Sequence, residues 1–243
     1  MPSGDNEWWR DAVIYQVYPR SFSDSDGDGL GDIPGIVSKV DYLDNLGVDA
    51  IWISPFYESP LLDGGYDVTD YRLVDPRLGE FADVEDLIDA AHAKDMKIFM
   101  DIVPNHTSSA HAWFQEVLHS EPGSPAWDRY VIKEGKGANH EIPPTNWQSV
   151  FHGDAWTPLV LANGEKTQYW YLHIFDSSQP DVNWENQEVR VEFESILKFW
   201  FDLGIDGFRI DVAHGLIKDQ SFPDIDYESI PEQELLGDPI LSP

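Results

Sequence analysis

The 243-residue sequence contains no cysteine, which excludes disulfides, thiolate zinc sites and cysteine nucleophiles. Basic residues are scarce, because 15 Lys and Arg stand against 45 Asp and Glu and leave a formal charge of −30. Such a chain has no basic surface for the phosphates of nucleic acids, and an anionic membrane would repel it. We therefore expect no nucleic-acid or membrane partner, and we interpret most of the acidity as a solvated surface.

Long apolar runs are also missing. No segment approaches the ~18 residues that a membrane helix needs, and residues 1–7 have neither the basic start nor the apolar stretch of a signal peptide. These absences predict a cytoplasmic location. Apolar residues nevertheless make up 42% of the chain and aromatic residues 13%, which is enough for a large packed core.

Four short runs rich in β-branched and aromatic residues predict buried strands, because each is bounded by Gly, Asp or Pro. They are Ala12–Tyr18, Ala50–Ser54, Lys97–Val103 and Gly207–Val212. Apolar residues at helical spacing predict helices between them, at Pro34–Leu46 (with Asp32 as cap and Gly47 as stop), Val84–Ala91 and Val189–Leu203. The alternation of strand and helix indicates a parallel sheet built from βα units.

The spacing of these units is uneven. About 100 residues separate the third predicted strand from the fourth, too many for a plain loop. The gap therefore predicts an inserted subdomain, and the recurring βα units predict a (β/α)8 TIM barrel, a fold that typically needs roughly 250 residues, represented here by its first four βα units. Residues 1–106 would begin the barrel, 107–176 would form a small inserted subdomain B after strand three, and 177–243 would continue the barrel with strand four and an acidic tail, ending before strand five.

The segment Asp24–Asp32 alternates carboxylates with small residues. Its positions 1, 3, 5 and 9 are acidic, and a backbone carbonyl would fill position 7; the ligands would be Asp24, Asp26, Asp28, Asp32 and Leu30. A hard divalent cation needs six or more oxygens in a tight loop. We predict an EF-like metal loop outside an EF-hand, with Ca²⁺ preferred over Mg²⁺; the alternative is a solvated acidic turn.

A second group of polar residues falls at the carboxyl ends of the predicted strands. His106 follows strand three, and Arg209 and Asp211 share one face of strand four because they are two residues apart. A guanidinium beside Asp211 would keep that carboxylate ionised, as a nucleophile requires, although a structural ion pair is the alternative. The chemistry of α/β barrels lies at this end of the strands, where the loop with Asp63 and Tyr66 also falls.

These motifs resemble those of the α-amylase superfamily of glycoside hydrolases, and within it the oligo-1,6-glucosidase/α-glucosidase branch. The matching segments run in family order: 8–22, Asp24–Asp32, Asp63–Asp67, Asp101–His106, Gln179–Trp184 and Gly207–Asp211. The resemblance implies a retaining, exo-acting α-glucosidase. Such an enzyme releases terminal α-1,6- or α-1,4-linked glucose from small oligosaccharides through a covalent glucosyl-aspartate.

The resemblance also implies a role for each residue. Asp211 matches the nucleophile and Arg209 the residue that orients it. His106 would hydrogen-bond the bound glucose, while Asp63 and Tyr66 would hold or stack on its terminal ring. Phe151 matches an aromatic residue of the inserted subdomain that lies near the substrate. The alternative is that Phe151 is a core aromatic.

A retaining enzyme needs a second carboxyl group as acid and base. In this family it is a Glu on strand five, which the predicted units do not include. We therefore expect the chain alone to be inactive and to need the remainder of the barrel. Two alternatives stay open: a transglycosylase or isomerase of the sucrose isomerase or trehalose synthase type, and a non-catalytic relative.

Overall fold

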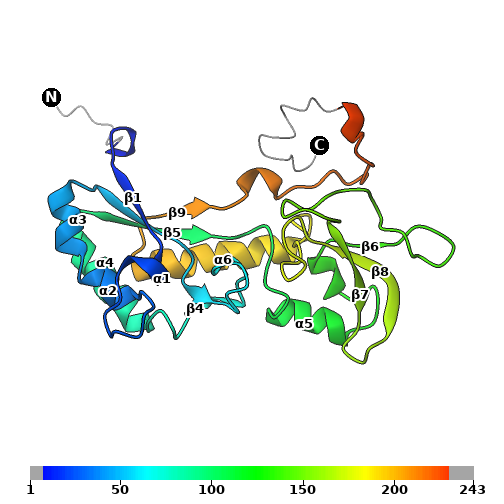
Figure 1. The fold of residues 1–243 in the computed structure, drawn as a ribbon, viewed down its shortest axis with the longest axis horizontal. Helices are drawn as coiled ribbons and strands as arrows, with labels where there is room; N and C mark the ends of the chain where they lie inside the picture. Colours follow the sequence, from blue (N-terminus) through cyan, green and yellow to red (C-terminus); the bar gives the residue numbers. More distant parts are fainter. Residues whose placement is uncertain (1–7, 230–243) are drawn as a thin grey trace. The chain divides into compact units, whose positions relative to one another are not determined.

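The computed structural model describes residues 8–229, which fall into two compact units. The described part of the first unit comprises residues 8–58, 71–102 and 196–209. That of the second comprises residues 59–70, 103–195 and 210–229. Figure 1 traces the chain and labels its helices and strands.

The first unit is built on a four-stranded sheet with the order β1-β2-β5-β9. Strand β1 (Ile14–Val17) runs parallel to β2 (Ala50–Ile53), and β2 runs parallel to β5 (Lys97–Ile102). Strand β9 (Gly207–Ile210, orange in Figure 1) lies next to β5. The four predicted strands are thus confirmed, each somewhat shorter than expected. A separate two-stranded sheet joins β3 (Tyr57–Glu58) to β4 (Asp70–Val74).

The helix predicted over Pro34–Leu46 is in fact two helices, α2 (Ile33–Val37) and α3 (Val40–Leu46). The Ser38 hydroxyl donates to the Gly35 carbonyl at 2.6 Å, a local bond of the kind that competes with helix continuation. Both predicted ends are confirmed. Asp32 caps α2 by accepting from the Gly35 N–H at 2.6 Å, and Gly47 ends α3 in the left-handed region at φ 85°.

The next helices cover the remaining predicted segments. Helix α4 (Phe81–His92) begins earlier than predicted, because Glu80 and Asp83 form a reciprocal capping box at its start. Helix α6 (Gln187–Leu203) contains the predicted Val189–Leu203 segment. Its Trp200 is fully buried and donates from Nε1 to the Tyr71 carbonyl at 2.8 Å. The first unit also contains α1 (Pro19–Phe22) and the short 3-10 helix η1 (Trp8–Arg10).

The second unit contains an antiparallel sheet of β6 (Ile132–Glu134), β8 (Lys166–Leu172) and β7 (Trp156–Val160), in that order. Helix α5 (Ala112–His119) lies beside these strands in Figure 1, and its Phe114 ring lies 5.1 Å from that of Tyr171. A buried cluster forms the core: Val131, Trp147, Ala155, Trp156, Leu172 and Ile174. Three short 3-10 helices complete the unit: η2 (Trp127–Arg129), η3 (Ala213–Gly215) and η4 (Tyr227–Ser229).

The elements of the predicted insertion, α5 and β6 to β8, belong to this second unit together with residues 59–70 and 210–229. The boundaries at 106/107 and 176/177 stay predictions. Of the predicted acidic tail, residues 219–229 contain no strand, and 230–243 lie outside the described residues. Among residues 8–229 no helix is both long enough and apolar enough to cross a bilayer.

Candidate active site

The predicted site residues fall in both units. The second unit contains the residues assigned to substrate and nucleophile: Asp63, Tyr66, His106, Phe151 and Asp211. The first unit contains Arg209 and the predicted metal loop Asp24–Asp32. Each group is built from contacts within its own unit.

The loop that carries Asp63 is held by a buried carboxylate. Asp67 is 0% exposed and accepts hydrogen bonds from the Ser59 hydroxyl (2.9 Å) and from the N–H groups of Leu62 (3.0 Å) and Asp63 (3.1 Å). A carboxylate satisfied by several donors is well suited to fix a turn. Asp67 therefore anchors the backbone from which Asp63 projects, a role that the motif alone did not assign to it.

His106 lies at the centre of the hydrogen-bond network of the second unit. Its side chain is buried, and its Nε2 lies 3.2 Å from the Tyr66 carbonyl oxygen and 3.1 Å from Gln179 Nε2. Gln179 Nε2 also donates to Asp63 Oδ2 at 2.8 Å. The structure thus brings together Asp63, the Tyr66 backbone and His106. Gln179, which joins them, was part of a recognised motif but had no predicted role.

Burial sets the ionisation of this network. It lowers the pKa of His106, an effect that the negative charges of Asp181 and Asp211 oppose. Burial also raises the pKa of Asp63, although the Gln179 hydrogen bond and His106 act in the other direction. The charge of Asp211 contributes to both pKa values, so Asp211 is electrostatically coupled to both residues.

Asp211 is followed by a strained residue. Val212 has φ 49° and ψ 34°, a left-handed conformation that is rare for a β-branched side chain. The Gly215 N–H donates to the Val212 carbonyl at 2.9 Å, and a Cβ at position 215 would lie only 2.9 Å from Val212 Cγ1. Gly215 therefore makes room for this turn. Such strain is concentrated at functional sites, and the catalytic role of Asp211 stays a prediction.

Phe151 is 51% exposed and contacts the site through another aromatic residue. Its ring lies 5.7 Å from that of Phe175, and the Phe175 ring lies 5.2 Å from that of His106. This exposure disfavours the alternative of a core aromatic for Phe151. Phe175, between the two, was not recognised in the sequence.

A buried lysine was also missed. Lys218 is 2% exposed at its side chain, and its Nζ lies 2.7 Å from Asn105 Oδ1 and 2.8 Å from Asp181 Oδ2. Asn105 and Asp181 belong to recognised motifs, but Lys218 follows the last motif in the acidic part of the sequence. Its only signal in the sequence is that no other Lys or Arg follows Arg209.

In the first unit, Arg209 pairs with Asp101. Arg209 Nη1 donates to Asp101 Oδ1 at 2.9 Å, and its guanidinium lies 5.1 Å from the centroid of the Trp52 ring. An arginine over an aromatic face gains a cation–π attraction. The predicted pairing of Arg209 with Asp211 stays a prediction.

The metal loop presents three exposed carboxylates. Asp24, Asp26 and Asp28 each offer an oxygen within 4.8 Å of the others, a donor set that suits a hard divalent cation. Backbone N–H groups, led by that of Gly27, lower the pKa of Asp24. The Asp32 carboxylate, by contrast, is engaged by the Gly35 N–H and by Ser25. Asp32 and Leu30 as ligands stay predictions.

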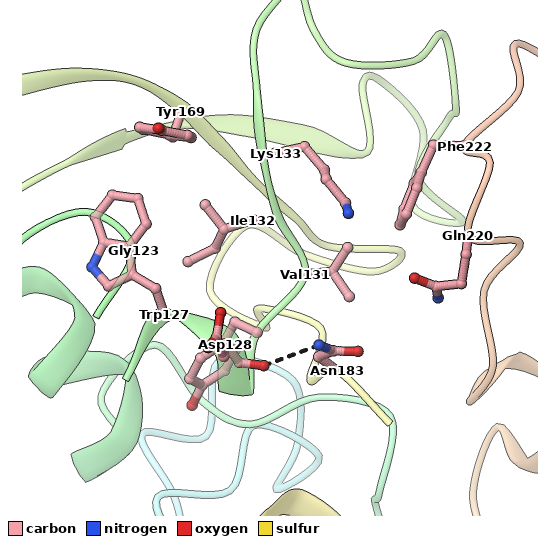
Figure 2. Close-up of a pocket in the computed structure, with 11 residues that line it drawn as sticks. Gly123, Trp127, Asp128, Val131, Ile132, Lys133, Tyr169, Asn183, Gln220 and Phe222 are labelled. Atoms are coloured by element: carbon pink, nitrogen blue, oxygen red, sulfur yellow. Dashed lines mark hydrogen bonds between the residues drawn. The ribbon is translucent and has the colours of Figure 1, made fainter. Parts of the chain in front are cut away.

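A cavity of about 210 Å³ lies elsewhere in the second unit (Figure 2). Aromatic side chains including Trp127, Tyr169 and Phe222 line it, and the Lys133 ammonium lies 4.4 Å from the Phe222 ring centroid. None of the predicted site residues lines this cavity. It is therefore distinct from the His106 network.

Comparison with known proteins gives concordant matches. The family model "Alpha amylase, catalytic domain" matches residues 16–238. Oligo-1,6-glucosidase from Heyndrickxia coagulans is 49% identical over 95% of this chain and 40% of its own length. The crystal structure of trehalose-6-phosphate hydrolase from Bacillus licheniformis superposes with a TM-score of 0.83 at 45% identity, covering 90% of this chain and 38% of that one. The crystal structure of isomaltulose synthase from Protaminobacter rubrum superposes with a TM-score of 0.85 at 41% identity, covering 93% of this chain and 39% of that one. The chain spans about 40% of the length of these relatives.

Proposed function

Because the chain belongs to the α-amylase family, we propose that it provides the nucleophile half of the active site of a retaining, exo-acting α-glucosidase. The substrate would be a small oligosaccharide with a terminal α-1,6- or α-1,4-linked glucose. The observation that carries this proposal is the grouping around Gln179, which donates a hydrogen bond to Asp63 and lies 3.1 Å from the His106 ring nitrogen, with Asp211 electrostatically coupled to both Asp63 and His106.

The reaction assigns a task to each residue. The Asp211 carboxylate attacks the anomeric carbon, the glycosidic oxygen leaves with a proton from a second carboxyl group, and water then releases glucose from the aspartate. Asp63 and His106 bind hydroxyl groups of the terminal glucose, and Tyr66 stacks on its ring. Binding of a chain end by these residues makes the cleavage exo-acting. Arg209, tied to Asp101, orients the strand that leads to Asp211.

The second carboxyl group is a chemical requirement, since it must lie roughly 5–5.5 Å from the nucleophile. The motifs recognised in this chain supply Asp211 and no acid/base partner for it. Turnover therefore needs the remainder of the barrel. An aryl α-glucoside tests this directly: the full-length enzyme should release the aryl alcohol, and the 243 residues alone should not.

The metal loop is proposed to hold Ca²⁺, with Mg²⁺ as the alternative. Asp24, Asp26 and Asp28 would supply carboxylate oxygens, and the cation would offset their mutual repulsion. The loop directly precedes α2, so the ion would stabilise this part of the first unit. We propose no catalytic role for it.

A second candidate is a transglycosylase or isomerase that uses the same nucleophile. The similarity to isomaltulose synthase, at a TM-score of 0.85, supports this second candidate. Products from sucrose and maltose separate the two functions. A hydrolase yields free monosaccharides, whereas an isomerase or transferase yields new disaccharides or longer glucosides. A non-catalytic relative would yield no product from either.

The test of the proposal is Asp211→Asn in the full-length protein. Turnover of an aryl α-glucoside should fall more than about a hundredfold, because loss of a nucleophile removes the covalent route. Asp202→Asn is the matched control, since Asp202 is an exposed α6 residue that pairs with Lys198 outside the predicted site, and it should leave the rate unchanged. Retention of more than about a hundredth of the rate in Asp211→Asn would refute the assignment.

A further inference from the structure

We propose that Lys218 is a positioning residue that holds His106 in the tautomer protonated on Nε2. In this form the ring presents a hydrogen-bond donor to a hydroxyl oxygen of the bound sugar. The sugar as ligand rests on the proposed function above. The tautomer itself follows from the buried network around Lys218 and can be tested without substrate.

The first step is the orientation of the Asn105 amide. The Lys218 ammonium can only donate, so the atom 2.7 Å from it must be the Asn105 oxygen. The side chains of Lys218 and Asp181 are buried, at 2% and 0% exposure, so no bulk water competes for this bond. The amide nitrogen of Asn105 must therefore face the other way.

The second step is the proton on His106. The Asn105 amide nitrogen lies 3.2 Å from His106 Nδ1, and an amide N–H can only donate. Nδ1 must then accept, which places the ring proton on Nε2. The Tyr66 carbonyl oxygen, which can only accept, lies 3.2 Å from Nε2 and receives this proton in the substrate-free network.

A competing tautomer exists in the same network. The Gln179 amide nitrogen lies 3.1 Å from His106 Nε2, and the Asp176 N–H fixes that amide by donating to its Oε1 at 3.1 Å. Gln179 could donate to Nε2 if the ring carried its proton on Nδ1. That form would require Asn105 to present its oxygen to Nδ1 and its NH2 group to the Lys218 ammonium. The ammonium excludes this arrangement, so Lys218 selects between the two tautomers.

A purely structural role for Lys218 is the rival explanation. Its ammonium lies 2.8 Å from the buried Asp181 carboxylate, and removing one partner of a buried ion pair is strongly destabilising. A Lys218 variant alone could therefore fail to fold without informing on His106. The pair is removed together in Lys218→Met/Asp181→Asn, which leaves no uncompensated charge. Asn105→Asp is an independent probe, because a carboxylate can accept from Nδ1–H while it still pairs with Lys218.

The experiment measures the ring ¹⁵N chemical shifts of His106, which distinguish a protonated from an unprotonated nitrogen. The protein is used at its full encoded length with ¹⁵N only in histidine, and the His106 signals are those lost in His106→Gln. The wild type should show protonated Nε2 and unprotonated Nδ1. Lys218→Met/Asp181→Asn and Asn105→Asp should both move the proton to Nδ1 in most molecules.

Two results would overturn the proposal. One is protonated Nδ1 in the wild type. The other is a folded Lys218→Met/Asp181→Asn protein that keeps the wild-type tautomer, which would reduce Lys218 to balancing the charge of Asp181. With a glucoside substrate, KM should rise about tenfold in the double variant relative to the wild type, because one hydrogen bond to the sugar is lost. If Asp211→Asn retains activity while the tautomer responds as expected, the proposed function fails and the role of Lys218 in setting the tautomer stands.

Discussion

Arg209 Nη1 donates a hydrogen bond to Asp101 Oδ1 at 2.9 Å, and the Asp101 side chain is fully buried. The other carboxylate oxygen, Oδ2, accepts from Trp52 Nε1 at 3.1 Å. These three residues come from the neighbouring strands β9, β5 and β2. One carboxylate therefore ties three adjacent strands of the parallel sheet together.

Asp101→Ala should lower the free energy of unfolding by about 2–3 kcal/mol. Removal of the buried carboxylate takes away the acceptor that Arg209 and Trp52 share. The Arg209 side chain is 39% exposed and can bind water instead, which limits the loss of stability. Urea unfolding followed by tryptophan fluorescence measures it. Asp202→Ala, which breaks the exposed i,i+4 pair with Lys198, should cost less than about 0.5 kcal/mol. Equal losses in the two variants would contradict the assigned role of Asp101.

His111 should make the stability of the second unit depend on pH. Burial lowers the pKa of His111 from 6.5 to about 4, and its Nδ1 caps α5 by accepting from the Trp113 N–H at 3.1 Å. Between these pH values the unfolded chain binds a proton that the folded chain does not. The contribution of His111 to stability should therefore fall as the pH decreases from about 6.5 to about 4 and stay level below that, with a loss of at most about 3 kcal/mol.

The measurement is the urea midpoint of the wild type and of His111→Asn between pH 7 and pH 4. Asparagine is a good N-cap residue without a titrating group, so it keeps the cap and removes the proton linkage. The difference between the two proteins isolates His111 from the many carboxylates that titrate in the same range. Parallel pH profiles would show that His111 contributes nothing to this dependence.

Much of the fold could be predicted because its signals are local. β-branched and aromatic runs gave the four strands of the parallel sheet, and the cap at Asp32 and the glycine at position 47 marked the ends of the first predicted helical segment. The break between α2 and α3 was missed because Ile36, Val40 and Leu43 keep the helical spacing across it. A short bond from Ser38 to Gly35, which periodicity does not report, accompanies the break.

The candidate site was predicted only in part because its contacts are long-range. Motif residues such as Asp63 and His106 were recognised by their resemblance to a family. Lys218 belongs to no motif, and its partner Asn105 lies 113 positions away in the sequence. A hydrogen bond of this kind depends on the tertiary fold that brings distant residues together, which composition and spacing do not encode.

Phe151 and Trp156 should differ sharply in their contributions to stability. Phe151 is 51% exposed, so Phe151→Ala should cost less than about 1 kcal/mol while it raises KM for an oligosaccharide. Trp156 is 2% exposed and donates from Nε1 to Thr145 Oγ1 at 2.8 Å. Trp156→Ala should cost about 3–5 kcal/mol by opening a cavity in the core of the second unit.

Thermal unfolding and steady-state kinetics of the full-length variants measure both effects. Phe175→Ala adds a useful comparison, because Phe175 contacts both Phe151 and His106. It should raise KM at least as much as Phe151→Ala does. A stability loss in Phe151→Ala as large as that in Trp156→Ala would show that the exposed ring is a structural residue.

The Asp24–Asp32 loop should bind a divalent cation that stabilises the first unit. Addition of Ca²⁺ at about a hundred times its Kd should raise Tm by about 5 °C, and excess EDTA should reverse the rise. The three carboxylate oxygens lie within 4.8 Å of one another, so a cation relieves a repulsion that the metal-free loop must bear.

Asp26→Asn removes one of the three carboxylates and should abolish most of the Ca²⁺-dependent rise in Tm. Without added metal, the same variant should be at least as stable as the wild type, because one negative charge has left the cluster. Asp86→Asn is the matched control: Asp86 is an exposed residue of α4, outside the cluster, and its loss should leave the response to Ca²⁺ intact. Comparing the rise in Tm with Mg²⁺ and with Ca²⁺ shows which ion the loop prefers. We expect Ca²⁺, since its flexible coordination tolerates an irregular set of oxygens better than the octahedral coordination of Mg²⁺ does. If neither ion changes Tm in the wild type, the loop is a solvated acidic turn.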